Sequence, residues 1–348
     1  MTFLKSRPWL STFLFLLALL GVAFVALIIR VYSAPLPPYV LRLLRVPHSQ
    51  VIYDPAQPEK TYSYGSSIDF HTGEYKVDKS TIYLPWQEGV EQIELETTLI
   101  LNHDVLNDES DALLALFDYQ QVPVTLAGES KLVHLFEVEP YSAQKIDFTI
   151  MVPNLPGRHK LWIYNIQAAD LHHLDSEFRQ KATSFAHGTD FDVVIGETSD
   201  FPQPDYQPAP PSQESPSGPE SGWNTINREA DRRTFWITDT VKSKQLLDFN
   251  IHVAHNILDE VPYALVALLD WQQIPLGDES PTYFGLIGKQ NGLQTLPATV
   301  QIPSTGTVHE LQVIYFIDPY RRLDETQDGI QWGGSSESQR VGLIKSSE

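Results

Sequence analysis

The distribution of hydrophobic and polar positions changes near residue 50. Residues 9–29 include no charged side chain. A helix of about 21 residues spans about 31 Å, close to the roughly 30 Å hydrocarbon core of a bilayer. We therefore predict an uncleaved transmembrane anchor at residues 9–30, after a cytoplasmic N-terminus at residues 1–8. A cleaved signal peptide is the alternative, but its apolar region is usually shorter, about 7 to 15 residues.

Residues 31–50 hold four prolines around the segment LRLLR. This pattern fits an interfacial helix, with leucine facing the lipid and arginine at the headgroups, as well as it fits an extended stalk. Both interpretations stay open at this point.

From residue 52 onward the hydrophobic positions form short segments, several of them alternating. Ile146, Phe148 and Ile150 are separated by polar residues, and this period of two is typical of a strand with one buried face. We predict first-half strands at residues 80–85, 92–102, 112–120, 131–138, 145–152, 160–166 and 190–195. An added edge hairpin is expected within residues 52–79.

One segment occurs twice. Residues 112–124, ALLALFDYQQVPV, return at residues 264–276 as ALVALLDWQQIPL, an offset of 152 (264 − 112). Self-similarity of this kind indicates a repeated structural unit. Because each copy has short strands separated by Gly, Pro, Asn and Asp, we predict an all-β fold. Its two tandem immunoglobulin-like β-sandwich domains, at residues 51–198 and 223–348, are related by internal duplication.

Residues 199–222 are rich in proline, with Ser, Gln and Glu between. Such a composition holds too little apolar surface to fold alone. We predict a semi-rigid spacer that separates the two domains.

The net charge of −20 lies entirely downstream of residue 30, because the first 30 residues contain no acid. A surface this acidic repels phosphate backbones, so nucleic acid is not an expected partner. The basic residues on the two sides of the anchor nearly balance, and they do not set its orientation. A large body behind one N-terminal anchor is commonly exported. We therefore predict a single-pass protein of the cell membrane with its C-terminal bulk extracytoplasmic.

The most specific polar pattern is Asp118-x-Gln-Gln-x-Pro, which recurs from Asp270. Such side chains can line a binding surface, but more often they fasten a corner by pairing backbone groups, and we favour that role. Tyr119 and Trp271 occupy the same repeat position, and each needs a partner for its polar atom when it is buried. Pro123 and Pro275 cannot donate to a ladder, so strand pairing is expected to end there or reach an edge.

His103 and His255 also share a repeat position, each beside acids or amides. This pattern fits a calcium or transition-metal site, or a turn in which Asp and Asn bond their own backbone. We favour the turn and predict no metal and no cofactor.

Two long connections, residues 168–189 and 318–339, precede the last strand of each half. Connections of more than about 12 to 15 residues are uncommon unless they bind something or are disordered. Both carry basic pairs near aromatic residues, which suits contact with a protein partner on an acidic body. The predicted partner-binding residues are His172, His173, Tyr320, Arg321, Arg322 and Trp332.

Catalytic and cofactor motifs are missing from the sequence. It contains no cysteine, and we find no nucleophile elbow, zinc-protease motif, phosphate loop or dinucleotide fingerprint. We therefore expect a non-enzymatic binding, adhesion or envelope scaffold module. An accessory subunit of a membrane complex is the first alternative. The second is an envelope hydrolase whose carboxylates and histidines meet only in space.

Overall fold

The computed structural model is built from β-strands and describes residues 64–71, 75–103, 109–139, 142–169, 186–197, 200–208, 213–214, 223–229, 236–255, 260–276, 280–287, 292–323 and 334–346. All of them belong to one unit, Tyr64–His103 with Asp108–Glu348. No helix occurs among the described residues, so none there is long and apolar enough to cross a membrane. The predicted anchor at residues 9–30 lies outside them.

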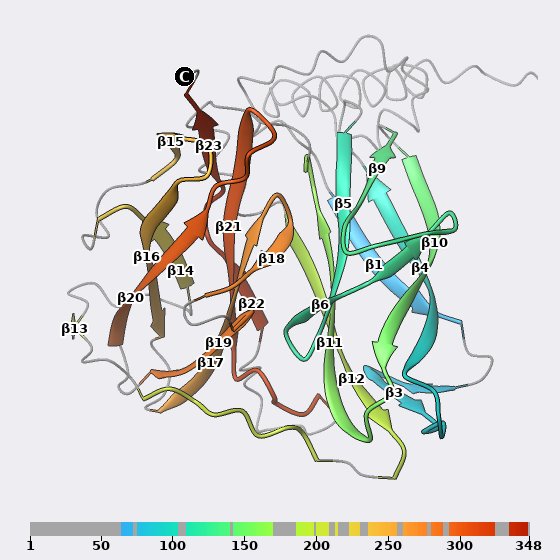
Figure 1. Ribbon diagram of the computed structural model, residues 1–348. Helices are drawn as coiled ribbons and strands as arrows, with labels where there is room; N and C mark the ends of the chain where they lie inside the picture. Colours follow the sequence, from blue (N-terminus) through green and yellow to red (C-terminus); the bar gives the residue numbers. More distant parts are fainter. Residues whose placement is uncertain are drawn as a thin grey trace, which may run out of the picture. The chain divides into compact units, whose positions relative to one another are not determined.

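The first half of the chain forms two sheets, coloured from blue to yellow-green in Figure 1. The first has the order β1-β4-β10-β7-β8, and the second β2-β3-β12-β11-β5-β6, with β9 also paired to β5. Their strands are β1 (Tyr64–Phe70), β2 (Lys76–Asp78), β3 (Thr81–Leu84), β4 (Gln92–His103), β5 (Glu109–Phe117), β6 (Gln120–Val122), β7 (Val124–Leu126), β8 (Glu129–Lys131), β9 (His134–Val138), β10 (Ser142–Pro153), β11 (Gly157–Ile166) and β12 (Ala186–Ile195).

The second half has a similar pair of sheets, ordered β13-β20-β16-β14 and β15-β23-β21-β17-β18. In the latter sheet β19 also pairs with β17, and β22 with β21. Their strands are β13 (Gln213–Glu214), β14 (Trp223–Asn227), β15 (Thr238–Val241), β16 (Leu246–His255), β17 (Val261–Leu269), β18 (Gln272–Ile274), β19 (Thr282–Ile287), β20 (Gly292–Gln301), β21 (Val308–Ile317), β22 (Gly334–Glu337) and β23 (Val341–Lys345).

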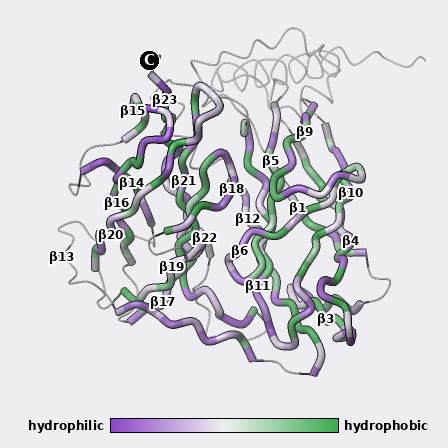
Figure 2. The backbone as a smooth tube through the Cα atoms, in the orientation of Figure 1, coloured by the Kyte–Doolittle hydropathy of each residue, from purple (hydrophilic) through white to green (hydrophobic). Residues whose placement is uncertain are grey.

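Each half encloses its own hydrophobic core between its two sheets, in a sandwich-like arrangement. In the first half, Leu95 of β4 and Ile150 of β10 share a cluster with Ala115 of β5 and Ile163 of β11. Hydrophobic and hydrophilic residues alternate along many of the strands (Figure 2). Because successive side chains point to opposite faces of a sheet, this alternation gives each sheet a hydrophobic inner face. The prediction of an all-β fold is therefore confirmed for the described residues.

Three local predictions are wrong. The strand expected at residues 112–120 ends at Phe117, because Asp118 and Tyr119 have positive φ angles of 47° and 67° and form a two-residue turn. The strands expected to make an edge hairpin, β1 and β2, pair with β4 and β3 in different sheets. The connection expected at residues 318–339 contains strand β22, which pairs with β21.

Where it is described, the proline-rich segment packs against both halves of the chain. Within residues 200–208, Gln207 N donates to Phe284 O at 2.9 Å, and the Tyr206 ring meets Phe284 edge-on. Asp200 O accepts from Arg158 N of the first half at 3.0 Å. The aromatic residues and open backbone groups of this segment are thus used for packing against both halves.

Candidate functional site

The two halves meet on the outer faces of β5 and β11 and of β17 and β21. The side chains that point away from each sandwich core form a third, shared hydrophobic cluster. Because these central strands are apolar on both faces, burial of the second face stabilises the contact between the halves. Its buried members are Ala112, Leu114, Leu116, Tyr119, Trp162, Tyr164, Ile166, Ala169, Ala264, Val266, Leu268, Trp271, Ile314 and Phe316.

The aspartate of each repeated motif holds the two-residue turn next to this contact. Asp118 Oδ1 accepts from the backbone N of Lys160 at 3.0 Å, and its Oδ2 lies 2.6 Å from His159 Nδ1. Asp270 does the same with Glu310 N at 2.9 Å and His309 Nδ1 at 2.6 Å. The aspartates therefore pair backbone groups at a corner, as we predicted.

The second glutamine of each motif reaches across to the other half. Gln121 N donates to Gln273 Oε1 at 2.6 Å, and Gln273 N donates to Gln121 Oε1 at 2.8 Å. Their side-chain amides donate to Trp271 O at 3.0 Å and Tyr119 O at 2.8 Å, respectively. Each copy of the motif thus donates to the other copy at the same positions at which it accepts from it. This is the pattern of a self-complementary interface.

Tyr119 and Trp271 repeat this reciprocity. The Tyr119 hydroxyl donates to Pro319 O, and Trp271 Nε1 donates to Ala169 O at 2.9 Å. The prediction that each buried ring finds a polar partner is confirmed. Period-two alternation would put Tyr119 on the same face as Phe117, but the positive-φ turn sends it to the shared cluster.

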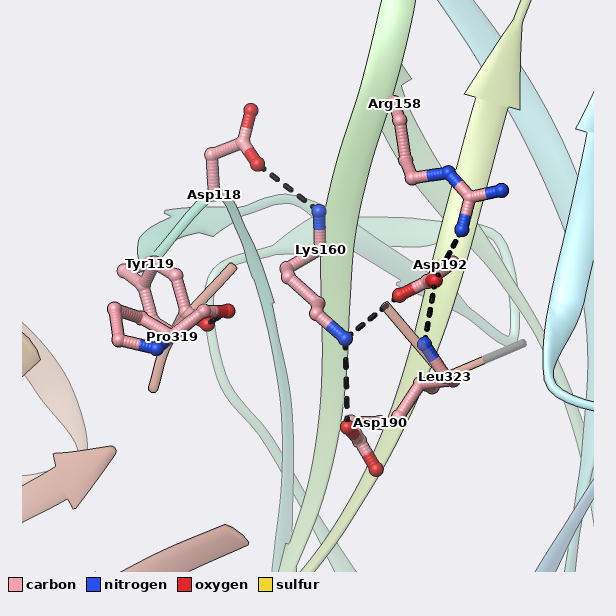
Figure 3. A network of polar contacts seen from close by, with 8 residues as sticks. All are labelled: Asp118, Tyr119, Arg158, Lys160, Asp190, Asp192, Pro319 and Leu323. Carbon is pink, nitrogen blue, oxygen red and sulfur yellow. Dashed lines mark hydrogen bonds and ion pairs between the residues drawn. The ribbon is translucent and has the colours of Figure 1, made fainter. Parts of the chain in front are cut away.

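A buried ion network lies beside Tyr119, at the neighbouring ends of β11 and β12 (Figure 3). The Asp192 carboxylate is 2.7 Å from Arg158 Nη1 and 2.6 Å from Lys160 Nζ, and these side chains are 0%, 2% and 2% exposed. Lys160 Nζ also lies 3.8 Å from Asp190. The second half contributes Leu323 N, which donates to Asp192 at 3.0 Å. One carboxylate therefore holds two buried cations and a loop of the other half.

A pocket of about 190 Å³ opens next to this network, with walls from both halves. Burial raises the pKa of Asp190 despite the neighbouring Lys160. Burial also raises the pKa of Asp318, against the opposing effects of Arg321 and Lys160. Two carboxylates and two cations thus share one small, partly desolvated space. The pocket is lined by Tyr119, Lys160, Trp162, Asp190, Ile317, Asp318, Pro319, Arg321, Leu323 and Gly334.

The structure describes three of the six residues predicted to bind a partner, and only one of these three lines the pocket. Arg321 lines the pocket, and Arg322 is half-buried next to it. Tyr320 is a packing residue, since its ring stacks on Phe284 and contacts Tyr119 edge-on. His172, His173 and Trp332 lie outside the described residues.

His103 and His255, whose pattern fits a metal site or a turn, are not among the described side chains. Among the side chains that are described, no group of three or more His, Cys, Asp or Glu is placed to hold a metal ion.

Sequence reasoning missed Lys160, Asp190 and Asp192. A signal was present, because two bases two residues apart precede the apolar core of β11, and two acids two residues apart occupy β12. Side chains at this spacing share one face of a strand, and neighbouring strands then bring opposite charges together.

Comparisons with known proteins add little. The chain matches no family model, and no curated protein matches it. A family 123 glycoside hydrolase from Clostridium perfringens aligns with 36% of this chain and 27% of its own, at 9% identity and a TM-score of 0.21. Red sea bream transglutaminase aligns over 84% and 33%, at 8% identity and 0.21. A Salmonella alpha-2-macroglobulin aligns over 80% and 16%, at 10% identity and 0.24.

The chain thus spans 27%, 33% and 16% of the three solved chains. TM-scores this low support no inference about function.

Proposed function

We propose that the chain carries two immunoglobulin-like sandwiches that arose by duplication, behind the predicted N-terminal anchor. The support is the strand order, since β3-β12-β11-β5 in one half corresponds to β15-β23-β21-β17 in the other. In both, the first of these strands pairs in parallel with the last strand of its half. An arrangement of this kind opposite a second antiparallel sheet is typical of immunoglobulin-like folds.

The function that this geometry favours is a membrane-anchored, extracytoplasmic binding module that captures a protein partner. One observation carries the proposal: the charged pocket at the contact between the repeats, where Lys160, Asp190, Asp318 and Arg321 converge. Pockets with a few convergent polar groups and perturbed pKa values are the usual places for ligand recognition. A partner held there would contact both halves at once.

A capture experiment with the full chain in mild detergent tests this function. Wild type, Arg321→Gln and a matched control, Lys145→Gln, are immobilised and exposed to envelope extract of the source organism. Lys145 is exposed on β10. We expect the control to retain the proteins that wild type captures and Arg321→Gln to lose at least one of them, with unchanged circular dichroism. Identical captured sets for all three would refute a partner site at the pocket.

An acid–base hydrolase is a second candidate, favoured by one observation. Asp190 and Asp318 line the same pocket, and burial raises the pKa of both. General acid and general base catalysis commonly uses a pair of carboxyl groups with perturbed pKa values. We expect turnover of chromogenic aryl glycosides or esters that both Asp190→Asn and Asp318→Asn abolish. Turnover that survives both substitutions, or none by wild type, would remove this candidate.

A further inference from the structure

The pocket has a counterpart elsewhere in the molecule, and that counterpart is filled. Strand register defines the equivalence, because Leu161 pairs with Phe191 as Leu311 pairs with Val341, a shift of 150 (311 − 161). The turn residues shift by 152 (271 − 119). Five residues that line the pocket thereby have an equivalent in the other half: Lys160 corresponds to Glu310, Asp190 to Arg340, Ile317 to Gln167, Asp318 to Ala168, and Tyr119 to Trp271.

In the filled counterpart a guanidinium group occupies the space. Arg340, which is 1% exposed, donates from Nη1 to Gln167 O at 3.3 Å and from Nη2 to Ala168 O at 3.1 Å. Its guanidinium carbon lies 4.7 Å from the centre of the Trp271 ring, and its Nε is 3.7 Å from Glu310. The site therefore offers carbonyl oxygens, an aromatic face and a carboxylate to a planar cation.

In the open copy Asp190 stands where Arg340 stands in the other. An aspartate side chain is too short to reach the equivalent carbonyl groups, and the cavity of about 190 Å³ lies among the residues that correspond to the arginine's neighbours. Tyr119 supplies the aromatic wall in place of Trp271. The open pocket thus keeps the aromatic wall and the carbonyl-bearing positions of the filled site, but Asp190 replaces its arginine and Lys160 replaces its carboxylate, Glu310.

The charges of the pocket fit a cation, although two cations already line it. Lys160 is held by Asp192 at 2.6 Å and lies 3.8 Å from Asp190, so its charge is compensated within the protein. The charge of Arg321 acts on Asp318, where it opposes the effect of burial on the pKa of that carboxyl group. Burial raises the pKa of Asp190 and of Asp318, and a cation bound beside these carboxyl groups would favour their ionised forms.

We infer that the pocket binds a guanidinium group, contributed by an arginine-like ligand, between Asp190, Asp318 and the Tyr119 ring. This inference rests on the proposed binding function and names the chemistry that the partner presents. The ligand is either a free guanidinium compound or an arginine side chain of the captured protein. Both supply the same planar donor.

Calorimetric titration of the full chain in mild detergent with methylguanidinium chloride tests the inference. Methylurea has nearly the same shape without the charge and serves as the ligand control. We expect saturable binding of methylguanidinium to wild type, no measurable binding of methylurea, and at least tenfold weaker methylguanidinium binding by Asp190→Asn. Asp318→Asn is the second variant, should Asp190→Asn fail to fold, and Asp69→Asn, on an exposed position of β1, should bind as wild type does.

Three outcomes would overturn the inference: equal binding of methylurea, unchanged affinity in both folded pocket variants, or binding of acetate in place of methylguanidinium. Arginine amide and a capped Gly-Arg-Gly peptide distinguish the two sources, since a protein-borne arginine requires the peptide to bind at least as well as the amide.

A competition experiment, in which methylguanidinium is present during partner capture, distinguishes this inference from the proposed function on which it rests. If capture depends on Arg321 but no guanidinium compound binds or competes, the guanidinium inference fails and the binding module stands. If methylguanidinium binds through Asp190 while capture is unaffected by every pocket variant, the site stands and the proposed partner function fails.

Discussion

The reciprocal glutamine contact gives a direct test of the way the two halves are joined. Replacing Gln121 with alanine removes the acceptor of Gln273 N at 2.8 Å and the donor to Trp271 O at 3.0 Å. It also removes a bond from Gln121 Nε2 to Leu132 O at 3.1 Å, but that contact is exposed to water and contributes little. Each bond across the half-buried contact is worth about 1 kcal/mol, and the groups left behind lose their partners. We therefore expect a loss of about 2 to 3 kcal/mol.

Equilibrium unfolding in urea, followed by tryptophan fluorescence, measures this loss. Gln120→Ala is the matched control, because Gln120 is the exposed neighbour of the same residue type, and it should change stability by less than about 0.5 kcal/mol. Gln273→Ala and its own exposed neighbour, Gln272→Ala, repeat the comparison in the second half. If Gln121→Ala is no more destabilising than Gln120→Ala, the contact between the halves is not the one described.

Two further predictions concern buried carboxylates. Burial raises the pKa of Glu337 from 4.5 to about 7; its stabilising effect is therefore full below pH 4.5 and lost as the pH rises through 7, by at most about 3 kcal/mol. Glu337→Gln should flatten the dependence of unfolding free energy on pH over this window, and an unchanged slope would contradict the assignment. Asp192→Asn leaves the buried Arg158 and Lys160 without their shared counter-ion and should cost about 3 to 5 kcal/mol in urea unfolding. A loss below about 1 kcal/mol, similar to that of the exposed control Asp69→Asn, would refute this role.

Local pattern was sufficient for much of the fold. The period-two alternation around Phe148 predicted a strand that the structure shows as β10, extended to Ser142–Pro153. Pro123 and Pro275 mark the ends of β6 and β18, as expected from their missing donors. The repeated Asp-x-Gln-Gln-x-Pro motif predicted a fastened corner, because short polar side chains at a strand end usually pair backbone groups.

Other features depend on information that local pattern does not contain. Tyr119 lies on the opposite face from Phe117, because two positive φ angles at the turn interrupt the alternation. The pocket joins Lys160, Asp190 and Asp318, and the proximity of such distant positions is set by the packing of one half on the other. The motif predicted the turn, but not that Gln121 would bond to its own repeat, Gln273.

The reciprocity of the glutamine contacts has a consequence for assembly. Hydrogen bonds that Gln121 and Gln273 exchange would form equally well between halves that belong to different molecules. Specificity for the partner on the same chain must therefore come from the connection, whose residues 200–208 lie against both halves. Tethering raises the local concentration of the correct half far above that of any neighbour. Shortening this segment would favour pairing between halves of different molecules, and repeated pairing of that kind gives linear polymers.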